Sequence, residues 1–424
     1  MSPGRLSPLL AVIPWLCAAS STARADELAE LLAAARDADL SLREQGAQIE
    51  LADAQARVER AARYPSLTVR AGYVRNQREV DVLIPGLDAA VLVPLDQVDG
   101  EVRLEVPLLD VQTSSRIEAA EADADAGRAR GAAVAVDVDR AVVVAYYQWV
   151  AGTALVDAAE LAESTAQDTV EVVEGRRDAG AASQLDVARA QADVAWAWQR
   201  RADAALVVAG ARRELRTRTG RAPEGPAPAL PADTAAEAPL DTWLGDADVM
   251  PDVRAARAAH RASEVAADAA ELSWIPTVTA FAAERLTNAS GFGERATWSV
   301  GVTATWRLEL ETLRSARVAD AGERVGAVRL GRAAQAARDR ITDAWDLIDA
   351  RRAAADAAAA QVAAAHEALD VARVRIRGGL ATPLDLLGAQ RDAFAADVEL
   401  VQARAELAAA RALLRLAAGR EVTP

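Results

Sequence analysis

The sequence predicts a mainly α-helical fold with a small β component, in which one structural unit occurs twice. The 424-residue chain is 52% hydrophobic but only 4% aromatic, a composition typical of long, closely packed helices. Two stretches without proline, residues 116–177 and 316–376, carry helix-forming residues at nearly every position. Short runs in which apolar and polar residues alternate precede both stretches, and this alternation predicts strands.

The N-terminus predicts a signal peptide, residues 1–25. Arg5 supplies the positive charge, residues 9–19 form the apolar segment, and Ala23-Arg24-Ala25 is a small-x-small cleavage site. The only cysteine, Cys17, lies inside this segment, and a retained lipid anchor on it is the alternative. If the signal peptide is cleaved after Ala25, the mature chain contains no thiol, which excludes disulfides and cysteine chemistry.

The first copy of the structural unit is predicted to comprise residues 26–218. It begins with a helix whose apolar residues recur at helical spacing and which ends at Tyr64-Pro65. A β-hairpin, residues 66–108, follows, with one apolar face and one charged face. A long helix, 116–177, and a second helix, 183–218, complete this copy.

A proline-rich linker, residues 219–241, separates this copy from the second, residues 242–424. The same order of elements recurs there, which indicates a diverged internal repeat. The predicted elements of the second copy are a helix 252–274, a β-hairpin 276–308, a long helix 316–376 and a helix 383–418.

Each long helix is followed by the same kind of turn. Glycine, at Gly180 and Gly379, ends one helix because it can adopt a positive φ. Ser183 and Thr382 then cap the next helix, and each has an aspartate three positions later, Asp186 and Asp385, in a box-like arrangement. Either turn alone predicts only a helical hairpin; two copies joining such long helices indicate a shared role.

The strands have the pattern of outer-membrane strands, about ten residues with one apolar and one polar face. Four strands cannot close a barrel, and an open sheet edge in lipid leaves backbone groups unsatisfied. Three chains of four strands each would supply 12, an even number within the known range. The polar face would line the lumen with Arg70, Asp99, Glu101, Arg103, Glu105 and Arg307.

Other features limit the functional classes. No stretch after the signal approaches the ~20 apolar residues of a spanning helix, which argues against a helical membrane protein. Trp298 and Trp306 lie on the apolar strand face and suit membrane interfaces, with core packing as the alternative.

The formal charge of −15 argues against a nucleic-acid partner. Only two histidines occur, His260 and His366, without ligand-like spacing, so we predict no catalytic residue, no cofactor and no metal site.

A resemblance to a known family is carried by the two proline-led strand pairs, by residues 249–253 and above all by the segments Gly180 to Gln191 and Gly379 to Gln390. On these residues, the chain resembles the outer-membrane efflux (TolC-like) family. This resemblance covers essentially the whole mature region. It implies a homotrimer in which a 12-stranded barrel in the outer membrane continues as a periplasmic α-helical tunnel. It also implies a passive duct of a tripartite efflux or type I secretion system, docked to an inner-membrane pump through a periplasmic adaptor (membrane fusion) protein.

The resemblance also assigns roles to the two turns. They would be the periplasmic tips that meet the adaptor, through Gly180, Ser183, Leu185, Gly379, Thr382 and Leu384. Asp186 and Asp385 would form the pore constriction, with plain helix capping as the alternative role. A second family carboxylate is replaced by Gly388, and the Tyr and Arg of the family's gate latch fall on Ile376 and Ala381. That latch is therefore expected to be absent.

Two alternatives stay open. A duct of the same fold could carry metal ions or secreted proteins instead of small organic molecules. A secreted periplasmic or surface coiled-coil protein without a pore would explain the helices and the acidity. It would not explain why strand pairs with lipid-like alternation stand between a proline and each long helix.

Overall fold

The computed structural model describes residues 19–83, 85, 90–223, 225–245, 247–291, 293–306 and 310–422. Most of the predicted signal peptide and the predicted lumen residue Arg307 lie outside these residues. The chain forms two compact units. We call Met1–Gly46, Gly131–Val253 and Ala334–Pro424 the hairpin unit, and Ala47–Arg130 with Arg254–Ala333 the sheet unit.

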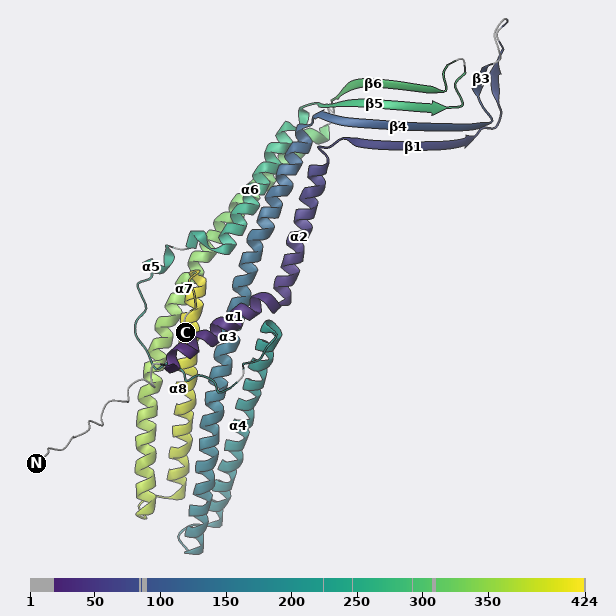
Figure 1. Cartoon of the computed structure of the whole chain (residues 1–424). Helices are drawn as coiled ribbons and strands as arrows, with labels where there is room; N and C mark the ends of the chain where they lie inside the picture. Colours follow the sequence, from purple (N-terminus) through teal and green to yellow (C-terminus); the bar gives the residue numbers. More distant parts are fainter. Residues whose placement is uncertain are drawn as a thin grey trace, which may run out of the picture. The chain divides into compact units, whose positions relative to one another are not determined.

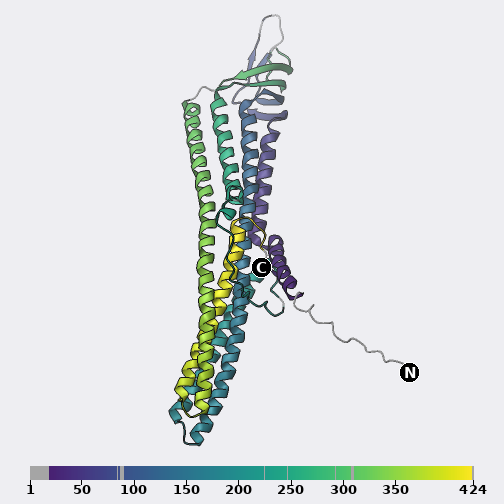
Figure 2. The same cartoon turned by 90° about the vertical axis from the view of Figure 1, so that its left-hand side faces the viewer.

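Two helical hairpins dominate the hairpin unit. The helices α3 and α4 lie side by side, and so do α7 and α8 (Figure 1, Figure 2). The α3 and α7 helices each have 68 residues, and part of each belongs to the sheet unit. The helices of this unit are α1 (Ala19–Ala38), α3 (Val111–Asp178), α4 (Gln184–Thr219), α5 (Asp241–Leu244), the 3-10 turn Ala247–Val249, α7 (Leu310–Arg377) and α8 (Pro383–Ala417).

The core of the hairpin unit gathers side chains from α1, α3, α4 and α8. Tyr146 and Trp149 of α3 are almost fully buried there, with ring centroids 5.7 Å apart. Among the described residues, α3 is the one helix with an 18-residue window apolar enough to cross a membrane, and 44% of that window is buried. The sequence predicted no such window. A core helix has the same composition, and α3 supplies buried valines such as Val142 and Val143 to the core of this unit.

The linker before α5 is held by side chains of the long helices. Arg411 of α8 donates to the carbonyl oxygens of Asp233 (2.9 Å) and Ala235 (2.6 Å). Trp345 of α7 donates its indole N–H to the carbonyl oxygen of Ala238, 2.9 Å away. These bonds satisfy backbone groups of a segment that has no secondary structure of its own.

In the sheet unit, four strands form one antiparallel sheet in the order β1-β4-β5-β6 (Figure 1). The two predicted hairpins therefore join through β4 and β5. A second, two-stranded sheet of β2 (Val80–Val82) and β3 (Ala90–Val93) forms between β1 and β4, within the predicted hairpin 66–108. The main strands are β1 (Ser66–Arg75), β4 (Asp96–Leu109), β5 (Thr277–Thr287) and β6 (Ala296–Thr305).

The first predicted helix is two helices, because the chain breaks at Asp39 between α1 and α2 (Leu40–Ala61). The Asp39 carboxylate accepts from the Ser41 amide at 2.7 Å and pairs with Arg218. Burial raises the pKa of Asp39, but these hydrogen bonds outweigh it and lower the pKa below its usual value. A charged N-cap of this kind starts a new helix.

The other helix ends differ from the predictions by a few residues. The α3 helix starts at Val111, five residues early, because the Asp110 carboxylate accepts from the Thr113 amide at 2.8 Å and caps it. The α6 helix (Pro251–Glu271) ends early and continues as the 3-10 turn Leu272–Trp274.

Candidate functional sites on the strands and at the helix turns

The predicted lumen residues that the structure describes lie on one face of the sheet. Arg70 stands directly opposite Glu101, and Glu101 opposite Arg285. Because side chains alternate along a strand, Asp99, Arg103 and Glu105 share this polar face with Glu101. Its charged side chains on the four main strands balance, with three arginines and three carboxylates: Arg70, Arg103, Arg285, Asp99, Glu101 and Glu105.

Arg103 is held at the centre of the polar face. Its Nε donates to Glu105 at 2.7 Å, and its guanidinium lies 4.4 Å from the centroid of the Phe281 ring. The Phe281 ring in turn lies over Gly301, where an added Cβ would come within 2.9 Å of it. The alternation pattern did not single out Phe281, because its role depends on the strand register that places it opposite both Glu105 and Gly301.

The opposite face of the sheet is apolar and exposed. Val69 stands opposite Val102, and both Val69 (68%) and Val300 (71%) are exposed. Trp298 is 80% exposed and stands opposite Glu284, an acidic residue within this face. Within the described part of the chain, the strands β1 and β6 form open edges of the sheet. An exposed apolar face with two unpaired edges is typical of an interaction surface.

The two helix turns have the same backbone geometry. Gly180 has a φ of 75° and Gly379 a φ of 74°, which confirms the predicted left-handed positions. In each turn the residue after the glycine donates its amide to a carbonyl five residues back: Ala181 to Arg176 at 2.7 Å, and Leu380 to Arg375 at 2.8 Å. This Schellman pattern satisfies carbonyls that the helix end leaves free.

A complete capping box starts the helix after each turn, as predicted. The Ser183 hydroxyl accepts from the Asp186 amide at 3.2 Å, and the Asp186 carboxylate accepts from the Ser183 amide at 2.9 Å. Thr382 and Asp385 repeat these bonds at 3.3 and 2.8 Å. Hydrogen bonds from the hydroxyl and amide of Ser183 lower the pKa of Asp186. The amide and hydroxyl of Thr382 lower the pKa of Asp385 in the same way.

Apolar side chains of the turns remain uncovered in the single chain. Leu185 (57%) and Leu384 (55%), which the sequence singled out, are both exposed, and Leu380 is 74% exposed. Exposed leucines beside tightly hydrogen-bonded backbone make these turns rigid, partly apolar ends.

Side chains also connect the two helical hairpins close to their turns. Arg176 of α3 donates to the carbonyl oxygen of Ile376 on α7 at 2.7 Å. Gln390 of α8 donates to Thr169 at 2.7 Å, and Arg391 of α8 pairs with Asp193 of α4. Ile376 stands where the resemblance places the tyrosine of the gate latch, and here the backbone carbonyl of this residue, not a side chain, accepts the bond from Arg176. No sequence signal marks that bond, since any residue supplies a carbonyl.

Neither histidine belongs to a metal-binding cluster. His366 lies 3.0 Å from Asp397, and His260 lies 3.3 Å from Glu264. Over the described residues, no group of three His, Cys, Asp or Glu side chains is placed to hold a metal ion.

Comparisons with known proteins agree with this geometry. The model of the "outer membrane efflux protein" family matches residues 31–221 and 249–420. The outer membrane efflux protein BepC of Brucella suis biovar 1 (strain 1330) is 28% identical over 265 residues, which span 60% of this chain and 57% of that relative's length.

Solved structures share the fold. The outer membrane protein VceC of Vibrio cholerae has a TM-score of 0.77 at 20% identity, covering 93% of this chain and 97% of that one. The open state of the MtrE outer membrane channel of Neisseria gonorrhoeae has a TM-score of 0.76 at 23% identity, covering 93% and 89%. The outer membrane efflux protein family consists of transport ducts and not of enzymes. The family match over both halves of the chain shows that it belongs to the TolC-like outer membrane efflux protein family and is a protein of the outer membrane.

Proposed function

We propose that the chain is the passive outer-membrane duct of a tripartite efflux or type I secretion system, and that three copies close a 12-stranded barrel. The observation that carries this proposal is the four-stranded sheet with an exposed apolar face and two open edges. The signal peptide, the proline-rich linker near the middle of the tunnel and the two structural repeats predicted from the sequence belong to the same proposal.

The strand lengths suit the outer membrane. The edge strands β1 and β6 have 10 residues each. At ~3.3 Å per residue and a tilt of about 40°, such strands rise roughly 25 Å, the height of the apolar band of outer-membrane barrels. An edge left open in lipid would cost several kcal/mol for each unsatisfied backbone group. Pairing of β1 with β6 of a neighbouring copy removes both edges.

Closure of this barrel turns the polar face inward. The lumen then receives Arg70, Asp99, Glu101, Arg103 and Glu105, with Arg307 as a further candidate outside the described residues. The charges on the polar face of the described strands balance, so this part of the barrel wall favours neither cations nor anions, and Arg307 would add one positive charge per chain beyond it. Selection among substrates then belongs to the pump, and the duct carries whatever the pump delivers.

In the trimer, six turns would surround one end of the helical tunnel. Their exposed leucines, Leu185 and Leu384, and the rigid backbone around Gly180 and Gly379 suit docking of a periplasmic adaptor protein. Ser183 and Thr382 keep the two docking ends ordered. Asp186 and Asp385, ionised at neutral pH, would give the constriction its charge.

Disulfide cross-linking tests barrel closure. The only cysteine, Cys17, lies in the predicted signal peptide, so Val69→Cys can be combined in turn with Trp298→Cys, Val300→Cys or Val302→Cys. At least one pair should give covalent trimers in outer membranes. The matched control is Val102→Cys with Val300→Cys, because β4 is an inner strand and does not reach a neighbour. Monomers for every edge pair would refute the barrel.

Single-channel recording tests the constriction. Replacing both Asp186 and Asp385 by alanine should lower the preference for cations in planar bilayers, since the ring loses its negative charge. Asp203→Ala, an exposed position in the middle of α4, is the control. An unchanged reversal potential would remove both aspartates from the constriction and leave them as helix caps.

A further inference from the structure

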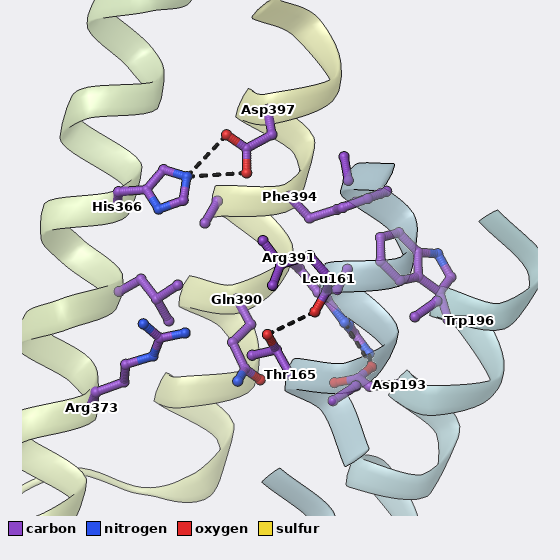
Figure 3. A pocket seen from close by; sticks show the side chains of 16 residues that line it. Leu161, Thr165, Asp193, Trp196, His366, Arg373, Gln390, Arg391, Phe394 and Asp397 are labelled. Atoms are coloured by element: carbon purple, nitrogen blue, oxygen red, sulfur yellow. Dashed lines mark hydrogen bonds and ion pairs between the residues drawn. The ribbon is translucent and has the colours of Figure 1, made fainter. Parts of the chain in front are cut away.

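A cavity of about 320 Å³ lies between the two helical hairpins of the hairpin unit, lined by α3, α4, α7 and α8 (Figure 3). Its volume falls at the small end of ligand sites in proteins, where a bicyclic organic molecule fits. We infer that this cavity binds a small aromatic carboxylate.

Aromatic and aliphatic side chains form the apolar part of the cavity. Trp196 of α4 and Phe394 of α8 meet edge to face, with centroids 5.3 Å apart and planes at 80°. Leu161 of α3 lines the cavity although it is 66% exposed, and Leu369 of α7 contributes from the opposite hairpin. A planar ring placed here gains an edge-to-face aromatic partner and removes exposed leucine surface from water.

The charges of the lining select the sign of the ligand. Both carboxylates of the cavity already have a partner: Asp193 is ion-paired with Arg391, and His366 Nε2 lies within hydrogen-bond distance of Asp397. Arg373 also lines the cavity. Its ion-pair partner Asp370, 3.3 Å from the guanidinium, is not part of the lining, and the Asp370 side chain is 75% exposed. Such an exposed pair contributes little, so the guanidinium of Arg373 is available to a ligand.

A carboxylate matches this arrangement better than an amine. The guanidinium group presents parallel N–H donors that a carboxylate accepts in a bidentate manner. An organic cation would instead have to displace Arg391 or His366 from its carboxylate, and displacing Arg391 would disturb the nearly buried Asp193, whose side chain is 7% exposed. The cavity therefore discriminates by charge as well as by shape.

Because both hairpins supply lining residues, a bound ligand contacts α4 and α8 at the same time. It therefore stabilises the spacing of the two hairpins at which the cavity exists. The binding itself does not depend on the proposed duct or on its trimeric barrel.

Calorimetric titration of the full mature chain in detergent, with 2-naphthoate and 2-naphthylmethylammonium as a pair matched in shape, tests the inference. Naphthoate should bind the wild-type chain above the micelle background, and the ammonium probe should not. Arg373→Gln should weaken naphthoate binding at least 10-fold. Arg377→Gln, one turn further along α7 and outside the lining, is the matched control and should leave it unchanged.

Filling the cavity separates binding inside it from binding elsewhere. Ala162→Phe places a ring in the cavity from the partly exposed side of α3 and should abolish naphthoate binding while the helical circular dichroism is kept. If Ala162→Phe fails to fold, Arg373→Gln still tests the inference, because it changes an exposed side chain and should leave the fold intact. Absence of naphthoate binding by the wild-type chain, stronger binding of the ammonium probe, or equal binding by wild type and Arg373→Gln would each overturn the inference.

Discussion

Removal of the Arg391 guanidinium should destabilise the hairpin unit by about 2 kcal/mol. Its partner Asp193 is almost buried, with 7% of its side chain exposed, whereas 57% of the Arg391 side chain is exposed. Breaking a fully buried pair costs about 3–5 kcal/mol because the remaining charge is left uncompensated. Since one partner here is half in water, we expect roughly half of that cost for Arg391→Ala.

An exposed pair in the same unit provides the control. Arg351 of α7 and Glu406 of α8 also join two helices, at 2.6 Å, but their side chains are 40% and 51% exposed. Arg351→Ala should cost less than about 1 kcal/mol. Unfolding in guanidinium chloride, followed by far-UV circular dichroism, compares the free energies of unfolding of the two variants at equal detergent concentration.

A second substitution identifies the cause of the loss. If the uncompensated Asp193 charge is responsible, Asp193→Asn should restore part of the stability of Arg391→Ala, so that the two effects are not additive. The reasoning is refuted if Arg391→Ala costs no more than Arg351→Ala, or if Asp193→Asn destabilises the Arg391→Ala chain further.

Three further predictions concern the sheet and the turns. Gly301→Ala should destabilise the sheet by about 1–3 kcal/mol, because the new Cβ displaces the Phe281 ring; an unchanged thermal midpoint would contradict this. Gly379→Val should cost more than ~1 kcal/mol, since its φ of 74° disfavours a branched side chain, and adaptor pull-down should weaken while trimers persist in gels. The pKa values of Asp186 and Asp385 are lowered in the folded chain. The stability they add is therefore present at neutral pH and is lost as the pH falls below about 4. The difference in melting temperature between wild type and the double Asn variant should shrink in acid and stay constant between about pH 6 and 8.

Local features were the most predictable from the sequence. The left-handed glycines and the capping boxes depend on residues within six positions of each other, so Gly180, Ser183 and Asp186 suffice to define a turn. The faces of the strands follow from alternation alone, which placed Arg70 and Glu101 on one side of the sheet before their register was known.

Features that depend on distant partners could not be predicted. The stacking of Arg103 on Phe281 requires the pairing of β4 with β5 and joins residues 178 positions apart (281 − 103). The bond from Arg176 to the carbonyl of Ile376 spans 200 positions and ends on a backbone atom. The break at Asp39 is a different case, because a local cap signal was present but the helical periodicity of its neighbours continued through it.

The balanced charges on the polar face of the sheet have a hydrodynamic consequence for the proposed barrel. A pore wall with a net charge collects mobile counterions, and a voltage across the membrane then drags those ions and the surrounding water in one direction. The described strands, with three arginines and three carboxylates per chain on this face, collect no such excess. In this part of the channel, an electrical potential should therefore drive no bulk flow of water, and solutes should move by diffusion or by pressure from behind.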